Sequence, residues 1–450
     1  RFAARGLEED GTESWGLDNV SVLLTPPEGP WITALVIEAE DFATRAIGGS
    51  VPDGWNLWQT GRITDWVRFD PRCTRVRMTG VFRGDPAFGR WPIMGMLINQ
   101  RFEASATLSQ HTWTAHAFDV NAPPGVHQVG FCFTNDEPPA PGQDRNLYAD
   151  RLEIAVPADT PEDAWPVRVP IPDDLAEPPI PPTDDDVVTL ARNNIERYRK
   201  GDFCVRVLDP SGRPVAHQPV RFDMFRHHFR WGTAVRFDLE NPDTPLERAY
   251  RRELGRMFNY GTTENLLRWG YFEPQRGQPR YDDLDAYIDI CQHLGITLKA
   301  HNLVWGHFED LPRWLTDDDA RIADVMTRYA GRLAEYDVVN EPLHALQWEF
   351  WAGPSHLENA LIQAARSDPA AKLLVNEYEI VAVPYMADNF LIRMKDAMRR
   401  GAPLHGVGIQ LHSNIGEWYT PLELWRAFER MSQLGVELNL TEVSLGSENA

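Results

Sequence analysis

The chain has 450 residues, of which 43% are hydrophobic, and its formal net charge at pH 7 is -22. This length predicts two or three folded domains with a large core. The acidic balance argues against a nucleic-acid partner, because phosphate binding requires a basic surface. No apolar run approaches the ~20 residues that cross a bilayer, so we expect no membrane partner either.

The first third of the chain has the pattern of β-structure. Residues 13–24, ESWGLDNVSVLL, resemble the closing strand of a β-sandwich, so we interpret residues 1–30 as the remnant of an upstream β-domain. From residue 35 to residue 156, short strands are punctuated by Gly, Pro and Asn without a helical period. This pattern predicts an all-β sandwich, jelly-roll-like in type.

Residues 157–186 form a proline-rich interval. Proline at this density disfavours helices and sheet pairing and favours extended polyproline conformations. We therefore expect a semi-rigid linker between two domains.

Residues 187–450 alternate apolar strands with helices. Seven candidate strands begin near residues 229, 258, 297, 335, 372, 405 and 437. Near-continuous apolar strands in this alternation predict a parallel sheet, and seven units favour an α/β fold of the TIM-barrel type, (β/α)8. The last strand-helix unit is not visible in the sequence, so we expect the natural chain to continue past Ala450 or another element to close the barrel.

Polar side chains gather at the ends of these strands, where such barrels form their active face. They are Glu264, Asn265, His301, Trp305, Asn340, Glu341, Asn376, Glu377, Gln410, His412 and Glu442. One carboxylate at a strand end can belong to a structural ion pair with a basic side chain. Two of them, Glu341 and Glu442, each follow a polar residue at the end of an apolar run, which is a stronger signal.

Paired carboxylates flanking a cleft suit the cleavage of a glycosidic bond. One must be protonated to donate to the leaving oxygen, and the other must be ionised. A separation of roughly 5–5.5 Å between the carboxyl groups gives retention of configuration, and about 6.5–9.5 Å gives inversion. The sequence leaves this choice open.

The ordered motifs TTENLLRW, AHNLVWGHFEDLPRWL, YDVVNEPLH, LLVNEYE, GVGIQLH and LNLTEVS resemble those of glycoside hydrolase family 10, the retaining endo-β-1,4-xylanases. The resemblance covers about residues 187–450. It implies that Glu341 is the acid/base and Glu442 the nucleophile. It further implies substrate contacts at Glu264, Asn265, Arg268, His301, Trp305, Asn340, Gln410 and His412.

Three departures from the family pattern fall on sugar-binding positions. Arg268 replaces a lysine, LVWG replaces LVWH with His307 one place later, and Glu377 replaces an aspartate. The planar guanidinium of Arg268 binds differently from a point ammonium. The alternatives are therefore a related hydrolase acting on another β-linked polysaccharide, or a non-catalytic glycan-binding protein.

The segment FCFTNDEPPAPGQDRNLYADRLEI concentrates oxygen-bearing side chains in a loop between two strands. Such a loop suits calcium, although a simple Asx-rich turn is the alternative. Residues 35–156 resemble the calcium-dependent xylan-binding modules of families 36 and 60. The resemblance implies calcium near Glu38, Glu40 and Asp150, and ligand-site oxygens from Asp136, Asp144 and Asn146.

These expectations combine into a modular, secreted endo-β-1,4-xylanase that needs no cofactor for catalysis. Export, or placement in the periplasm or at the cell surface, follows indirectly because a polymeric glycan cannot enter the cytoplasm. We expect xylan as the partner and a monomeric protein.

Overall fold

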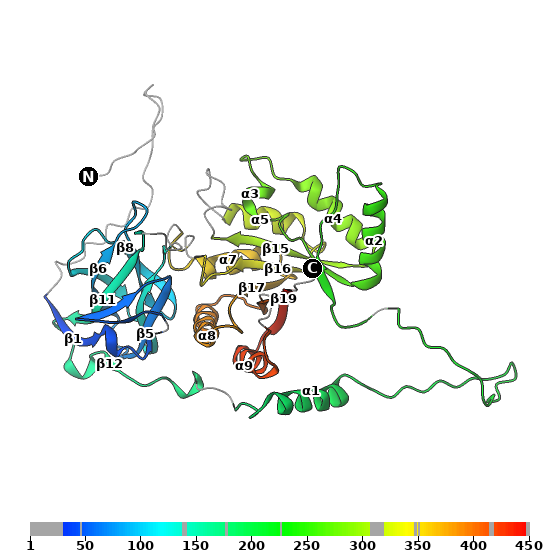
Figure 1. Ribbon diagram of the computed structural model, residues 1–450, viewed down its shortest axis with the longest axis horizontal. Helices are drawn as coiled ribbons and strands as arrows, with labels where there is room; N and C mark the ends of the chain where they lie inside the picture. The colour runs from blue at the N-terminus through cyan, green and yellow to red at the C-terminus, as the bar shows by residue number, and fades with distance from the viewer. Residues whose placement is uncertain are drawn as a thin grey trace, which may run out of the picture.

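The computed structural model describes residues 30–45, 47–136, 142–175, 179–225, 227–306, 319–345, 349, 352–413 and 418–446. Their N-terminal part is a body of strands, and their C-terminal part is a body of strands and helices beside it (Figure 1). The expected upstream remnant, residues 1–30, lies outside the described residues except for its last residue. No helix in the described ranges is both long and apolar enough to span a membrane.

Two antiparallel sheets make up the N-terminal body, which we call the sandwich. The first has the order β3 (Gly49–Val51), β4 (Gly54–Leu57), β11 (Asn146–Pro157), β6 (Arg75–Asp85) and β9 (Thr114–Asn121), with β1 (Trp31–Glu38) paired to β11. The second has the order β12 (Val167–Arg168), β5 (Gly61–Phe69), β10 (Gly125–Phe133), β7 (Ile93–Ile98) and β8 (Arg101–Thr107), with β2 (Thr44–Arg45) paired to β5.

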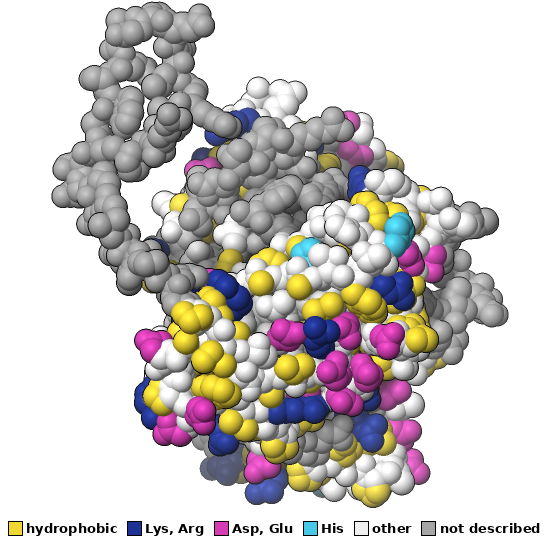
Figure 2. Space-filling model, turned by 90° about the vertical axis from the view of Figure 1, so that its left-hand side faces the viewer, with side chains coloured by type: hydrophobic (Ala, Val, Ile, Leu, Met, Phe, Trp, Pro, Cys, Tyr) yellow, Lys and Arg dark blue, Asp and Glu magenta, His cyan; other side chains and the backbone are white. Residues whose placement is uncertain are grey.

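Alternating apolar residues from both sheets fill the core of the sandwich. Phe82 and Phe131 meet edge to face with ring centroids 4.7 Å apart, and both are fully buried. The region is sheet-rich, as predicted, and its jelly-roll type stays a prediction. Figure 2 looks at this end of the molecule, where acidic and basic side chains are interspersed. Within the sandwich, Arg75 and Arg77 of β6 pair with Asp119 of β9.

Part of the interval expected to be a linker is folded against the sandwich. The two residues of β12 pair with Arg68 and Val67 of β5. The side chain of Trp165 packs on the sandwich core, and short 3-10 turns occupy Ala39–Asp41, Glu162–Ala164 and Asp173–Leu175. Proline restricts helices but permits extended edge pairing, which explains how this proline-rich segment adds a short strand to a sheet.

Seven parallel strands form the sheet of the C-terminal body, which we call the barrel domain after its predicted fold. They are β13 (Gly232–Ala234), β14 (Tyr260–Thr262), β15 (Thr297–Trp305), β16 (Glu335–Asn340), β17 (Lys372–Glu377), β18 (Gly406–Ser413) and β19 (Glu437–Leu445), paired in chain order. Each of the seven expected strands is therefore present. An eighth strand and the closure of the barrel stay predictions.

Helices alternate with these strands as a (β/α) fold requires. Their bounds are α1 (Asp184–Tyr198), α2 (Pro245–Met257), α3 (Trp269–Phe272), α4 (Tyr281–His293), α5 (Asp319–Arg328), α7 (His356–Ser367), α8 (Pro384–Arg399) and α9 (Pro421–Ser432). The local sequence explains where some of these helices begin, and α9 is the clearest example. Helix α9 begins with a complete capping box, in which Thr420 and Glu423 each bond the other's backbone N–H.

Candidate active site

The parallel register brings the predicted site residues to one edge of the sheet. Trp305 at the end of β15 is in register with Asn340 of β16, which is in register with Asn376 of β17. On the next pair, Gln410 of β18 is in register with Glu442 of β19. Because successive parallel strands end on the same side, residues that are distant in sequence meet there.

Glu341 is held at the end of β16 by two side-chain donors. Its carboxylate accepts hydrogen bonds of 2.8 Å from Gln410 Nε2 and 2.8 Å from Trp305 Nε1. Its backbone φ is +54°, an uncommon conformation for a residue with a side chain, and Pro342 follows it. The sheet edge thus fixes both the backbone and the carboxylate of Glu341.

Burial raises the pKa of Glu341, and the negative charges of Glu377 and Glu442 act in the same direction. The hydrogen bonds from Gln410 and Trp305 oppose this effect, but they do not cancel it. The residue is only 8% exposed. Glu341 therefore retains its proton to higher pH than an ordinary glutamate, as a proton donor must.

Glu442 lies within β19, three residues before the strand ends, in a more open and more polar environment than Glu341. Asn376 Nδ2 donates to its Oε1 at 2.7 Å, and His412 Nε2 lies 3.2 Å from its Oε2. His301 Nε2 is 3.9 Å from Oε1. A carboxylate surrounded by donors in this way keeps its oxygen lone pairs oriented and available.

His301 is held in place by the buried ion pair of Asp337 and Lys299. Its Nδ1 lies 2.9 Å from Asp337 Oδ2, and Lys299 Nζ lies 2.7 Å from the other oxygen of Asp337. Burial acts to raise the pKa of Asp337, but Lys299 and His301 together lower it. The ionised aspartate orients the imidazole of His301 toward Glu442.

Arg268 occupies the face of Trp305. Its guanidinium carbon lies 4.4 Å from the centre of the indole ring, and its Nη1 donates to Asn265 Oδ1 at 2.9 Å. Glu264 precedes Asn265 in the turn after β14 and has a φ of +48°. Within the described residues, no hydrogen bond joins Glu264 or Asn265 to either of the two glutamates, so their expected sugar contacts stay predictions.

Asn376 belongs to the site, although it was not among the residues given a role from the sequence. It is fully buried, and its Nδ2 donates to both Asn340 Oδ1 at 2.8 Å and Glu442 Oε1 at 2.7 Å. Thr441 donates to Asn376 Oδ1 at 2.5 Å. Its position at the end of β17 was the available signal, but its role depends on strand register.

Glu377 has a different environment from the sugar-binding position expected for it. It is fully buried and accepts from Leu343 N and His344 Nδ1, both at 2.8 Å. His344 also lies 3.1 Å from Glu379 and stacks on Tyr378 with ring centroids 3.6 Å apart. Glu377 therefore supports the segment that follows Glu341. His307, which belongs to the LVWG departure, lies outside the described residues.

The expected calcium ligands of the sandwich lie in two places. Asn146 and Asp150 are both on β11, four residues apart, which corresponds to about 13 Å along a strand. Calcium binds its ligands at about 2.3–2.6 Å, so one ion cannot reach both groups. This agrees with the two sets of residues that the resemblance implied, one with Glu38, Glu40 and Asp150 and the other with Asp136, Asp144 and Asn146.

The donor chemistry fits calcium, but the donors are not gathered. Burial raises the pKa of Glu38, and the negative charges of Asp150 and Glu40 act in the same direction. Asp144 accepts from Asn146 Nδ2 at 3.0 Å, and Asp136 ends the described part of that loop. Among the described residues no three His, Cys, Asp or Glu side chains form a group able to hold a metal. The calcium ligands stay predictions.

Comparison with known families gives two matches along the chain. The model of glycosyl hydrolase family 10 matches residues 222–449, which is just over half of the chain. The model of a Ca-dependent, xylan-binding carbohydrate-binding module, CBM60, matches residues 76–165. Both resemblances noted in the sequence are therefore confirmed.

Several characterised proteins are similar to the barrel region. Endo-1,4-beta-xylanase A of Caldicellulosiruptor sp. (strain Rt8B.4) is 29% identical over 268 residues, covering 52% of this chain and 38% of that protein. Beta-1,4-xylanase of Dictyoglomus thermophilum is 31% identical over 213 residues, covering 44% and 59%. This chain thus spans less than two thirds of the length of these relatives.

The solved structure of a GH10 endoxylanase that was retrieved from sugarcane soil metagenome aligns with this chain with a TM-score of 0.44 and 25% sequence identity. The alignment covers 48% of this chain and 67% of that one.

Proposed function

The chain belongs to glycosyl hydrolase family 10, and we propose that it is a retaining, endo-acting hydrolase that cleaves β-1,4-xylosidic bonds in xylan. The observation that carries this proposal is the contrast between the two glutamates. Glu341 is buried, with a raised pKa, and Glu442 is more open and receives donors from Asn376 and His412. Two carboxyl groups in different environments suit the acid and the nucleophile of double displacement.

In the first step, Glu442 Oε attacks the anomeric carbon as Glu341 transfers its proton to the departing glycosidic oxygen. The glycosidic bond breaks, and a covalent glycosyl ester forms on Glu442. In the second step, Glu341, now ionised, removes a proton from water as the water oxygen attacks the same carbon. The ester bond breaks, Glu442 is released as a carboxylate, and Glu341 is protonated again.

The other residues of the edge prepare these steps. Gln410 and Trp305 point the Glu341 carboxyl group, and Asn376 and His412 orient Glu442. His301 and Asn340 border the same space, and we assign them contacts with the sugar at the cleavage point. We assign Glu264, Asn265 and Arg268 to the same binding surface, farther from the cleavage point.

We assign the sandwich the role of holding the polymer, with calcium bound by some of Glu38, Glu40, Asp136, Asp144, Asn146 and Asp150. Calcium, when bound, supplies a hard cation for oxygen ligands. A polymeric substrate further supports secretion of the protein, and we propose a monomer.

The test is hydrolysis of a panel of soluble xylan, β-glucan, mannan and galactan, with analysis of product lengths and anomeric configuration. Xylan should be cut internally, giving β-configured products first. A related hydrolase for another β-glycan is the second candidate, because Arg268 covers one face of Trp305 and alters a proposed sugar-binding surface. Cleavage of a different polymer alone would favour that candidate, and binding without cleavage would favour a non-catalytic glycan-binding protein.

A further inference from the structure

The sandwich is docked on the barrel domain through buried polar contacts. The turn between β7 and β8 consists of Asn99 and Gln100, with φ values of +52° and +65°. Asn99 Nδ2 donates to Asp396 Oδ1 at 2.8 Å, and Gln100 Nε2 donates to Asn389 Oδ1 at 2.9 Å. Asn99 and Gln100 are each 1% exposed, so the tip of this hairpin is fully enclosed against α8.

Apolar contacts join the same two bodies. Trp66 of the sandwich is 4% exposed and belongs to the hydrophobic cluster of the barrel domain, and Val126 packs against that cluster. Leu175, from the interval after the sandwich, belongs to it as well. Burial of polar and apolar side chains together fixes the orientation of the two bodies, unlike a tethered module that moves freely.

One contact between the bodies falls on the segment that follows Glu341. The Arg62 side chain on β5 is 6% exposed, and its Nη2 donates to the backbone oxygen of Leu343 at 2.6 Å. Glu377 accepts from the backbone N–H of the same residue at 2.8 Å. Leu343 is thus held at both of its backbone polar groups, the N–H by the barrel domain and the carbonyl by the sandwich.

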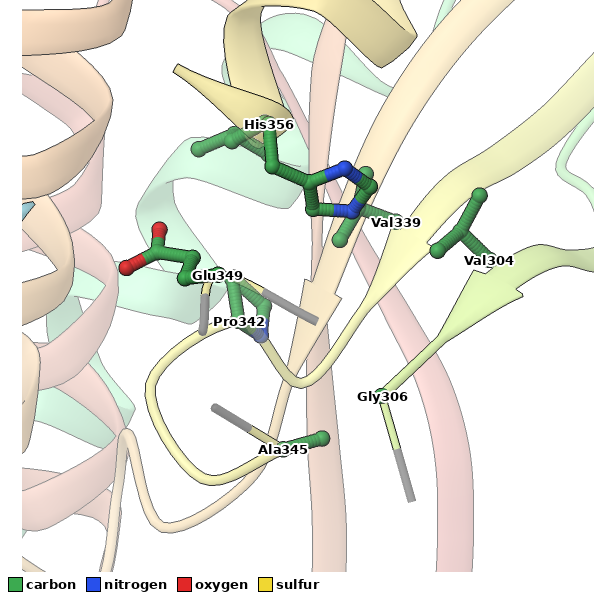
Figure 3. A pocket seen from close by; sticks show the side chains of 8 residues that line it. Val304, Gly306, Val339, Pro342, Ala345, Glu349 and His356 are labelled. Carbon is green, nitrogen blue, oxygen red and sulfur yellow. The ribbon is translucent and has the colours of Figure 1, made fainter. Parts of the chain in front are cut away.

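The held segment is a tight turn built on Glu341. The backbone oxygen of Glu341 accepts from Ala345 N at 2.7 Å and from His344 N at 3.1 Å. Figure 3 shows Pro342 and Ala345 on this turn, beside a small cavity that Val339, His356 and Glu349 also line. A residue with positive φ such as Glu341 keeps its conformation only where its surroundings hold it, so the contacts of Leu343 bear directly on the carboxyl group.

We propose that Arg62 of the sandwich is a positioning residue for Glu341. By holding the Leu343 carbonyl it fixes the turn, and through the turn it fixes the carboxyl group that protonates the leaving oxygen. The sandwich is then a part of the catalytic unit in addition to its role on the polymer. This inference rests on the proposed function of Glu341.

Misplacing a proton donor has a recognisable kinetic signature. A sugar alkoxide cannot depart without a proton, so cleavage between sugars depends strongly on the placement of the acid. A dinitrophenolate departs readily without one, so an aryl glycoside with this leaving group loses little. A general loss of structure would instead lower both rates together.

The experiment compares Arg62→Met, Arg62→Lys and the control Asn389→Ala in the full chain. Methionine keeps much of the side-chain volume but has no donor, and lysine keeps a charged donor. Asn389→Ala removes a contact between the two bodies on α8, away from the turn. For each protein, kcat/KM is measured on xylohexaose and on 2,4-dinitrophenyl β-xylobioside. Hydrogen exchange is followed with overlapping peptides that separate residues 343–345 from the rest of residues 335–345.

Arg62→Met should lower kcat/KM on xylohexaose by about tenfold, part of the 10²–10⁴-fold that a general acid contributes, with less than about twofold loss on the aryl substrate. Exchange at residues 343–345 should accelerate. Arg62→Lys should recover part of both effects, and Asn389→Ala should show neither.

Equal loss on both substrates, or exchange at residues 343–345 unchanged in Arg62→Met, would overturn the proposal. Hydrogen exchange needs no substrate. If the parent protein cleaved neither compound, the proposed function would fail, and unchanged exchange would separately reject the contact of Arg62 with the turn.

Discussion

The buried pair of Glu377 and His344 makes a prediction whose size follows from the structure. Burial acts against protonation of His344, but Glu377 and Glu379 raise its pKa from 6.5 to about 9. A shift of this size corresponds to roughly 3 kcal/mol of stability. Glu377 provides the larger share, so Glu377→Gln should lower the free energy of unfolding by about 2–3 kcal/mol at pH 6.

The pH dependence has a definite sign. The pKa of His344 is higher in the folded protein than in the unfolded chain, so the folded state holds its proton more tightly. The contribution is fully present below the ordinary histidine pKa of 6.5 and disappears as the pH rises through about 9. The coupling between Glu377 and His344 should therefore be large at pH 6 and small at pH 10.

The assay is a double-mutant cycle with Glu377→Gln and His344→Gln, using urea-induced unfolding at pH 6 and pH 10. Glu379→Gln is the matched control, because the Glu379 side chain is 42% exposed and should be coupled to His344 more weakly. A coupling below about 1 kcal/mol at pH 6, or equal values at both pH values, would refute a charged His344 in this segment.

Three further predictions concern the acid, the support of His301 and the sandwich. The hydrogen bond from Gln410 lowers the pKa of Glu341, so Gln410→Leu should raise that pKa further. The basic limb of the pH profile of kcat/KM should then move to higher pH. A basic limb at the parental pH would contradict Glu341 as the acid. Asp337→Asn should lower the free energy of unfolding, measured with urea, by about 3–5 kcal/mol, because it leaves Lys299 buried without its charged partner. A decrease under about 1 kcal/mol would reject the ion pair. Calcium added after chelation should raise the melting temperature of the parent protein, and Asp150→Asn should reduce that rise; identical rises would exclude Asp150 as a ligand.

The sequence could place Glu341 and Glu442 on apolar strands of the sheet because that signal is local, and their catalytic roles stay predictions. An apolar run followed by a polar residue, a glutamate and a proline predicts a strand end at Glu341, and a similar run precedes Glu442. The seven strands were predictable for the same reason, since near-continuous apolar runs mark buried parallel strands. Such patterns specify where a residue lies on its own element.

Contacts between elements were not predictable from these patterns. Glu377 follows Asn376 directly, yet successive residues of a strand face opposite ways, so Glu377 supports His344 while Asn376 bonds Glu442. The bond from Arg62 to Leu343 joins residues 281 positions apart. The pairing of β12 involves only two residues, too few to show a strand period within a proline-rich interval.

The most direct test of the central proposal is trapping of the nucleophile with 2,4-dinitrophenyl 2-deoxy-2-fluoro-β-xylobioside, followed by mass spectrometry of the intact and digested protein. The fluorine slows both steps by disfavouring their oxocarbenium-like transition states, and the good leaving group keeps the first step fast enough for the glycosyl ester to accumulate. We predict one fluoroxylobiosyl adduct per chain, on the peptide that carries Glu442, and none in Glu442→Ala. An adduct on another residue, or burst-free hydrolysis by the parent protein with no adduct, would contradict the assignment.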